Sequence, residues 1–129
     1  MKMYDQRFPG ITRFIQNLIS ETRTNGEVIT PYLGRKQVAE SSEAYKMVNY
    51  FVQGQAADVM KKKLLELSNT DGGQFMVMTV HDEIISDVPE EFVADVVHDF
   101  ETVMPETEGF SIPITVGVDV VDSWGDGYK

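Results

Sequence analysis

Hydrophobic residues recur at helical spacing in three stretches of the chain, each bounded by residues that start or stop helices. The first covers residues 11–24 and ends before Gly26, which can take the positive φ of a helix C-terminus. The second runs over residues 43–67 without a proline and follows serines able to cap it. The third starts at Pro89 and stops at Pro105. We therefore expect three helices, of which the second is the longest.

A β-hairpin is predicted at residues 75–88, where two apolar runs flank the polar sequence His81-Asp82-Glu83. A hairpin tip fixes the position of a carboxylate and leaves both of its oxygens in water. The same residues also suit an ordinary polar turn, because Asp is common in turns. The pattern alone therefore leaves a catalytic role and a plain turn both open.

An earlier hairpin with a basic tip is predicted between the first two helices. Its strands are expected at Glu27–Thr30 and around Tyr32–Leu33, with Pro31 between them, and its turn at Gly34–Lys36. Further on, alternating apolar residues predict a strand at residues 112–121. This order of elements favours an α+β domain, in which an antiparallel sheet is backed by helices.

The composition narrows the function classes. A chain of 129 residues suits one domain, or part of one, that can bury a core. Without cysteine it has no disulfides or thiolate metal sites, and no apolar run is long enough to cross a membrane. The net charge of −10 is uneven: residues 1–63 carry ten Lys and Arg against six Asp and Glu, and residues 64–129 carry one Lys against fifteen Asp and Glu. The first part could face phosphate, whereas the second could do so only with metal ions in between.

Polar and small residues gather on one face of the long predicted helix. Asn49 and Gln53 are four residues apart and so lie on one side of it, with Gly54, Ala56 and Ala57 around them. Asn and Gln can donate and accept hydrogen bonds at the base edges or sugars of nucleic acid. They could equally bond to neighbouring backbone. Glycine costs about 1 kcal/mol relative to alanine in a helix interior, so Gly54 needs a structural reason.

Five separated motifs occur in order along nearly the whole chain. They are Arg7-Phe8-Pro9-Gly10-Ile11, Gly34-Arg35-Lys36, the helix sequence Asn-x-x-x-Gln-Gly-x-Ala-Ala-Asp ending at Asp58, Val80-His81-Asp82-Glu83, and Ser123-Trp124. Together they resemble DNA polymerases of family A, the family of bacterial DNA polymerase I and of many phage replicative enzymes. The resemblance implies that residues 1–129 form one partial domain, the C-terminal part of the palm with the helix at the end of the fingers.

The resemblance implies a catalytic role for the predicted hairpin turn. Asp82 would bind catalytic Mg²⁺, Glu83 would support the metal site or the primer end, and His81 would lie near that end. The reaction would be nucleotidyl transfer from a dNTP to a primer 3′-hydroxyl, in which two Mg²⁺ ions stabilise the attacking and leaving oxygens. Carboxylate oxygens are the hard ligands that Mg²⁺ prefers.

The resemblance also implies contacts with primer–template DNA. Asn49 and Gln53 would touch the minor groove of the duplex, and Arg35 and Lys46 would meet its phosphates. Many bacterial members of the family carry Arg four residues before the Asn. Here that place holds Tyr45, so no contact is carried over to it.

Parts that this reaction needs in the family have no match in the chain. There is no second aspartate motif of the type Asp-Tyr-Ser-x-Ile-Glu-Leu-Arg, and no fingers helix that supplies a Lys and an Arg to the triphosphate. We therefore expect the chain to be inactive alone and to be completed by an upstream polymerase half, in the cytoplasm of a bacterium or a phage-infected cell. That half would be either another polypeptide or the rest of a longer reading frame. A non-catalytic DNA-binding module and an inactive polymerase remnant are the alternatives.

Overall fold

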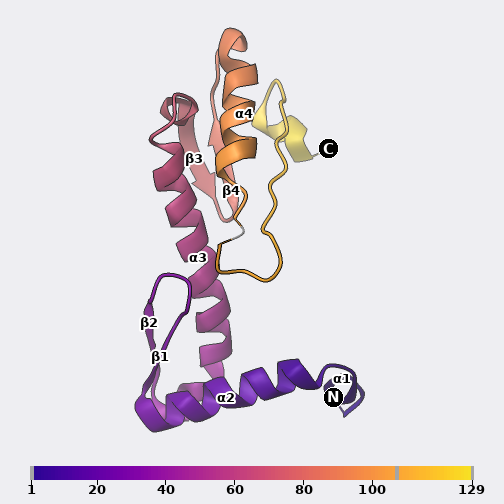
Figure 1. Ribbon diagram of the computed structural model, residues 1–129. Coiled ribbons are helices and arrows are strands. Elements are labelled where there is room, and N and C mark those ends of the chain that lie inside the picture. The colour runs from indigo at the N-terminus through magenta and orange to yellow at the C-terminus, as the bar shows by residue number, and fades with distance from the viewer. Residues whose placement is uncertain (1, 107, 129) are drawn as a thin grey trace. The chain divides into compact units, whose positions relative to one another are not determined.

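The computed structural model describes residues 2–106 and 108–128, and the chain divides into two compact units. The first unit comprises Met1–Asp58 and the second Val59–Lys129. Figure 1 shows the helices and strands of each unit along the chain. No helix in the described part is both long and apolar enough to cross a membrane.

Two helices begin the first unit, α1 (Lys2–Arg7) and α2 (Pro9–Asn25) (Figure 1). The second of them confirms the helix predicted at residues 11–24. It starts with a proline, whose missing N–H has no partner in the first turn of a helix in any case. It ends at Gly26, which has a φ of 75° and donates its N–H to the carbonyl of Thr22 at 2.8 Å.

A short hairpin follows, in which β1 (Glu27–Ile29) and β2 (Lys36–Val38) pair antiparallel. A hairpin is confirmed here, but the predicted second strand at Tyr32–Leu33 and the predicted turn at Gly34–Lys36 are both wrong. The turn lies at residues 31–33, and Lys36 belongs to β2. The turn contains a proline, which has no N–H for a strand ladder. It closes instead through the N–H of Gly34, which donates to the Thr30 carbonyl at 3.1 Å. Strand pairing therefore begins only after the turn.

The long helix is α3 (Met47–Leu67), and a 3₁₀ helix at Ser41–Lys46 leads into it. Together they confirm the helix predicted over residues 43–67. The start of α3 contributes to the core of the first unit, where the Phe14 and Phe51 rings also meet edge to face with their centroids 5.5 Å apart. The buried residues of this core are Leu18, Val28, Ala39 and Met47.

The later predicted hairpin is confirmed in the second unit. Its strands β3 (Met76–Val80) and β4 (Glu83–Ser86) pair antiparallel with Val80 opposite Glu83, so the turn has two residues. The first of these, His81, has a positive φ of 55°. Hairpin turns usually place glycine, asparagine or aspartate in such a conformation, because a larger side chain crowds the backbone there.

The helix α4 (Val93–Val103) packs against this hairpin and follows a 3₁₀ turn at Glu90–Phe92. It confirms the helix predicted after Pro89. Further 3₁₀ helices lie at Gly72–Phe75 and Trp124–Tyr128. The core of the second unit consists of buried Leu67, Val96 and Phe100, with Phe75, Met76, Ile84, Val88, Val103, Met104 and Val118 packed against it.

The strand predicted at residues 112–121 is wrong. Within this described stretch, pairing is limited to Ile114, which forms an isolated bridge with Glu106. A strand needs a neighbour for its backbone hydrogen bonds, whereas alternating apolar residues specify only which face would be buried. The described residues thus form two separate two-stranded sheets with helices against them, and the predicted α+β class is confirmed.

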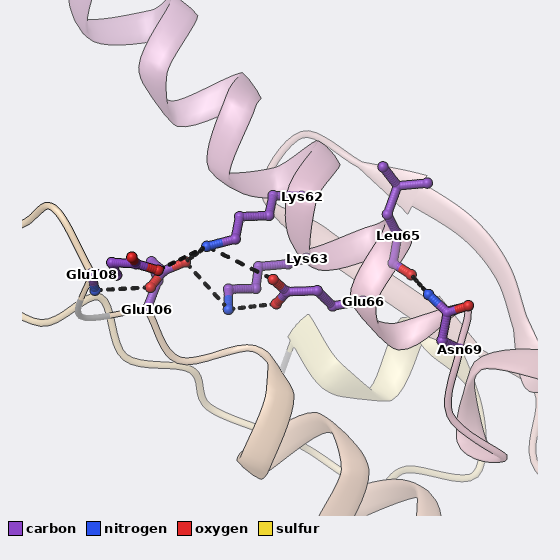
Figure 2. A network of polar contacts seen from close by, with 7 residues as sticks. All are labelled: Lys62, Lys63, Leu65, Glu66, Asn69, Glu106 and Glu108. Atoms are coloured by element: carbon purple, nitrogen blue, oxygen red, sulfur yellow. Dashed lines mark hydrogen bonds and ion pairs between the residues drawn. The ribbon is translucent and has the colours of Figure 1, made fainter. Parts of the chain in front are cut away.

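A buried ion network fixes the segment that follows α4 to the end of α3 (Figure 2). The Glu106 carboxylate lies 2.7 Å from Lys62 Nζ and 3.4 Å from Lys63 Nζ, and it accepts the N–H of Glu108 at 2.9 Å. Lys63 also pairs with Glu66 at 2.7 Å. Because a buried carboxylate is unfavourable without a cation, Glu106 holds its segment against these lysines.

Two leucines of α3 provide a matched test of the second core. Leu67 is fully buried and Leu65 is 68% exposed. We expect Leu67→Ala to lower the free energy of unfolding by about 2–5 kcal/mol, because it removes apolar contacts and leaves a cavity. Leu65→Ala should change it by no more than ~0.5 kcal/mol. Urea denaturation followed by circular dichroism measures both values, and equal losses would contradict the assigned core.

The positive φ of His81 predicts a strained turn. His81→Gly should raise the free energy of unfolding by about 1 kcal/mol, because glycine reaches the left-handed region without a steric cost. Asp87→Gly is the control, since Asp87 is also exposed but its φ is not positive, and there glycine should lower stability. Urea denaturation of both variants checks the expectation, which a less stable His81→Gly chain would refute.

Candidate functional site

The turn of the β3–β4 hairpin displays polar side chains at the surface of the second unit. His81, Asp82 and Glu83 are all exposed, and with Val80 they line an open hollow. The pairing of Val80 with Glu83 fixes the ends of the turn, and therefore the place of the residues in it. Exposed carboxylates can bind cations and accept hydrogen bonds. The structure thus brings together the three residues expected to be catalytic.

A magnesium ion would need more ligands than this turn supplies. Among residues 2–106 and 108–128, no group of three or more His, Asp or Glu side chains could hold a metal ion. Mg²⁺ requires near-octahedral coordination, which it fills with carboxylates, water and substrate phosphates. Asp82 and Glu83 do not make such a site by themselves. The metal-binding role of Asp82 therefore stays a prediction.

In the first unit, α3 presents two exposed amide side chains four residues apart. Asn49 and Gln53, which we call the amide face, are both exposed, and Tyr45 in the preceding 3₁₀ helix is 64% exposed. Because residues four apart are neighbours on an α-helix, the two amides lie next to each other on the surface of α3. The amide face carries no charge and offers both donors and acceptors. It can therefore bind a surface by directional hydrogen bonds.

Arg35, predicted to meet phosphate, is bound within the chain to Asp58. Its Nε lies 2.9 Å from each carboxylate oxygen of Asp58, and its Nη2 also donates to Oδ1. The Asp58 side chain is only 3% exposed, whereas that of Arg35 is 39% exposed. The hydrogen bond to Asp58 and the attraction between the two charges raise the pKa of Arg35. The guanidinium is thus engaged by a buried acid of α3.

Lys46, the other predicted phosphate ligand, also has an acidic partner. It forms an ion pair with Glu43, one turn earlier, and its Nζ lies 6.0 Å from the centroid of the Tyr45 ring. The hydrogen bond to Glu43 raises the pKa of Lys46, although burial opposes the shift. The side chain is 37% exposed, so it still reaches solvent. Its contact with phosphate stays a prediction.

Two residues to which the sequence assigned no role, Asp58 and Gln37, connect the first hairpin to α3. Gln37 of β2 donates from Nε2 to the carbonyl of Tyr50 at 3.1 Å. The signal for this contact was Gly54, because a glycine in a helix interior is unfavourable without a reason. A Cβ at Gly54 would lie 2.0 Å from Gln37 Nε2, so the missing side chain is what allows the approach.

Comparison with known proteins identifies the family. The sequence model of DNA polymerase family A matches residues 1–126. The chain is 30% identical over 128 residues to the DNA polymerase of Mycobacterium phage D29, which covers 97% of this chain. It is also 29% identical over 135 residues to the thermostable DNA polymerase I of Thermus aquaticus and 27% identical over 137 residues to DNA polymerase I of Lactococcus lactis subsp. cremoris, each covering 96% of this chain.

These relatives are much longer than the chain. It spans 20% of the length of the phage protein and 16% of the length of each bacterial one. The family match nevertheless extends through both compact units, and it includes the hairpin turn and the amide face. The chain therefore belongs to DNA polymerase family A.

Proposed function

We propose that this chain is the C-terminal palm portion of a DNA-directed DNA polymerase, with the last helix of the fingers. It would take part in the transfer of a nucleotidyl group from a dNTP to a primer 3′-hydroxyl. One observation carries the proposal: a chain matched by the family from residue 1 to 126 displays Asp82 and Glu83 on a tight, exposed turn. The relatives are named DNA polymerases, which supports the reaction class.

Asp82 would supply one carboxylate of a magnesium site, with its other ligands on the rest of the polymerase. Magnesium in such a site neutralises charge that develops on the attacking and leaving oxygens. Glu83, next to it at the start of β4, would steady this site or the primer end, and His81 would lie beside that end. The exposure of all three side chains supports these roles, because a site shared with DNA and another part of the enzyme must be accessible.

The amide face would contact the minor groove of the primer–template duplex. Every base pair presents an N3 or O2 acceptor there, so Asn and Gln can bond to the groove without selecting a sequence. A polymerase needs that tolerance, because it must move along any template. The absence of charge on Asn49 and Gln53 and their exposure on one line of α3 both support this role.

We further propose that residues 1–129 act as one partial domain that an upstream polymerase half completes. The chain spans a fifth or less of the length of the three relatives named above, and its described residues hold no three-ligand metal cluster. Both findings support a shared catalytic site. A DNA-binding module without catalysis is the second candidate, because the exposed amide face could bind duplex DNA whether or not the chain takes part in catalysis.

Replacing the turn carboxylate tests the catalytic role. This chain is co-expressed with the product of the upstream reading frame, and primer extension by the purified pair is measured. Asp82→Asn should lower the extension rate about 100-fold or more, because the loss of several kcal/mol of metal stabilisation is expected and about 1.4 kcal/mol corresponds to a tenfold change. Asp87→Asn removes the same charge from another exposed position of the same unit and should retain the rate within about threefold.

Two results would count against that proposal. Equal extension by the wild-type and Asp82→Asn pairs would show that the metal role is wrong. Duplex binding without any extension by the wild-type pair would favour the non-catalytic DNA-binding module.

Replacing the amides tests the DNA contact. Asn49→Ala and Gln53→Ala should each weaken duplex affinity about 2- to 10-fold, because each loses a hydrogen bond with a net value of about 0.5–1.5 kcal/mol. The loss should be similar for duplexes of different sequence. Gln16→Ala and Asn17→Ala, at exposed positions of α2, are the matched controls and should leave affinity unchanged. Fluorescence anisotropy with a labelled primer–template measures all four, and equal effects at both pairs of positions would contradict the assigned face.

A further inference from the structure

The β1–β2 hairpin is attached to one flank of α3 by two side chains, with a glycine between the attachment points. Gln37 donates to the carbonyl of Tyr50, and Arg35 binds the carboxylate of Asp58. Tyr50, Gly54 and Asp58 are four residues apart, so they follow one another along the same side of the helix. The residue before β2 and the middle residue of β2 therefore take part in one attachment.

Gly54 allows the close approach that this attachment requires. A Cβ at this position would lie 2.0 Å from Gln37 Nε2 and 3.6 Å from Arg35 Cδ. The first distance is far below van der Waals contact, so a side chain would displace the Gln37 amide from Tyr50. The glycine that is unfavourable for the helix is thus favourable for the contact between helix and hairpin.

Asp58 makes the attachment a strong constraint. Its side chain is 3% exposed, so the buried carboxylate needs partners inside the protein to compensate for its lost hydration. The planar guanidinium of Arg35 donates to both oxygens from two of its nitrogens, a geometry that the point charge of a lysine does not reproduce. Moving Arg35 towards a phosphate would leave the acid without these bonds.

We infer that Arg35 is a positioning residue and not a phosphate ligand. Through Asp58 it fixes the β1–β2 hairpin against α3. This attachment keeps the adjoining amide face in the conformation that binds the duplex. Asn49 and Gln53 immediately precede Tyr50 and Gly54, one step of about 100° around the helix from the attached flank. The inference rests on the proposed DNA contact of this face. It assigns to Asp58 and Gln37 a part in duplex binding although neither touches DNA.

A phosphate ligand and a positioning residue predict opposite effects for Asp58. If Arg35 bound a phosphate, Asp58→Asn would remove a competing negative charge, and duplex affinity would rise or stay constant. If Arg35 acts through Asp58, the same substitution weakens affinity although it removes a charge that repels DNA. The two roles also differ in salt dependence, because only a lost phosphate contact lowers the slope of log K against log salt, by about one.

The experiment measures duplex affinity at several salt concentrations for this chain with its polymerase partner. We expect Asp58→Asn and Arg35→Ala each to weaken binding about fivefold with an unchanged salt slope, and the double variant to bind no worse than either single variant. Arg35→Lys should recover little of the loss, because it keeps the charge and loses the paired hydrogen bonds. Glu40→Gln, which removes an exposed acid of the same unit, should bind like the wild type.

Amide hydrogen exchange of the 129-residue chain separates a local effect from unfolding. Asp58→Asn should speed exchange about tenfold at the hairpin amides of Thr30 and Gly34 and leave the β3–β4 amides unchanged. Should Asp58→Asn unfold the first unit, Gln37→Ala takes its place, because it breaks the other attachment without leaving a buried charge. It should weaken duplex binding about twofold.

Three results overturn one proposal or the other. A salt slope lowered by about one in Arg35→Ala, with affinity kept or raised in Asp58→Asn, would show that Arg35 binds a phosphate. Unchanged exchange at the hairpin in Asp58→Asn would show that the ion pair does not fix it. If Asn49→Ala and Gln53→Ala leave affinity unchanged while hairpin exchange still rises, the DNA role of the amide face is wrong and the attachment stands.

Discussion

A buried carboxylate must be paired, and in each unit of this chain one buried carboxylate links segments that are distant in the sequence. In the first unit Asp58 accepts from Arg35, and in the second Glu106 lies between Lys62 and Lys63. An unpaired buried charge would cost several kcal/mol. The ion pairs therefore select which surfaces meet: β1–β2 against α3 in the first unit, and the irregular segment after α4 against the end of α3 in the second.

Ion pairs within the first unit also weaken the case that its basic residues form a phosphate-binding surface. The excess of Lys and Arg in residues 1–63 favoured a phosphate-binding surface, yet Arg35 faces Asp58, Lys36 lies 2.5 Å from Glu27, and Lys46 pairs with Glu43. Cations already paired within the protein contribute less to a field that attracts DNA, because each acid cancels its partner at a distance. Uncharged amides then become the more suitable groups for duplex contact, since their hydrogen bonds do not depend on a net positive surface.

Elements whose signals are local could be predicted from the sequence, and elements that depend on a distant partner could not. Helix α2 and the β3–β4 hairpin carry their own periodicity and end signals, so their positions followed from the residues themselves. The alternating residues 112–121 carry the pattern of a strand, but pairing needs a second chain segment, and pattern gives no information about that. The attachment of Gln37 and Arg35 to α3 is likewise a long-range contact. Its one local trace was an unexplained glycine in the middle of a helix.

The candidate site also has a part that could be predicted from local sequence and a part that could not. The exposure of Asp82 follows from its place in a two-residue turn, which the sequence indicated, whereas a metal site needs ligands from several segments, which no single motif supplies. The structure adds a further argument on the choice between a catalytic turn and a plain one. His81 holds a left-handed conformation in which glycine would be more stable. Because strained residues cluster at functional sites, this conformation supports the role proposed for the turn.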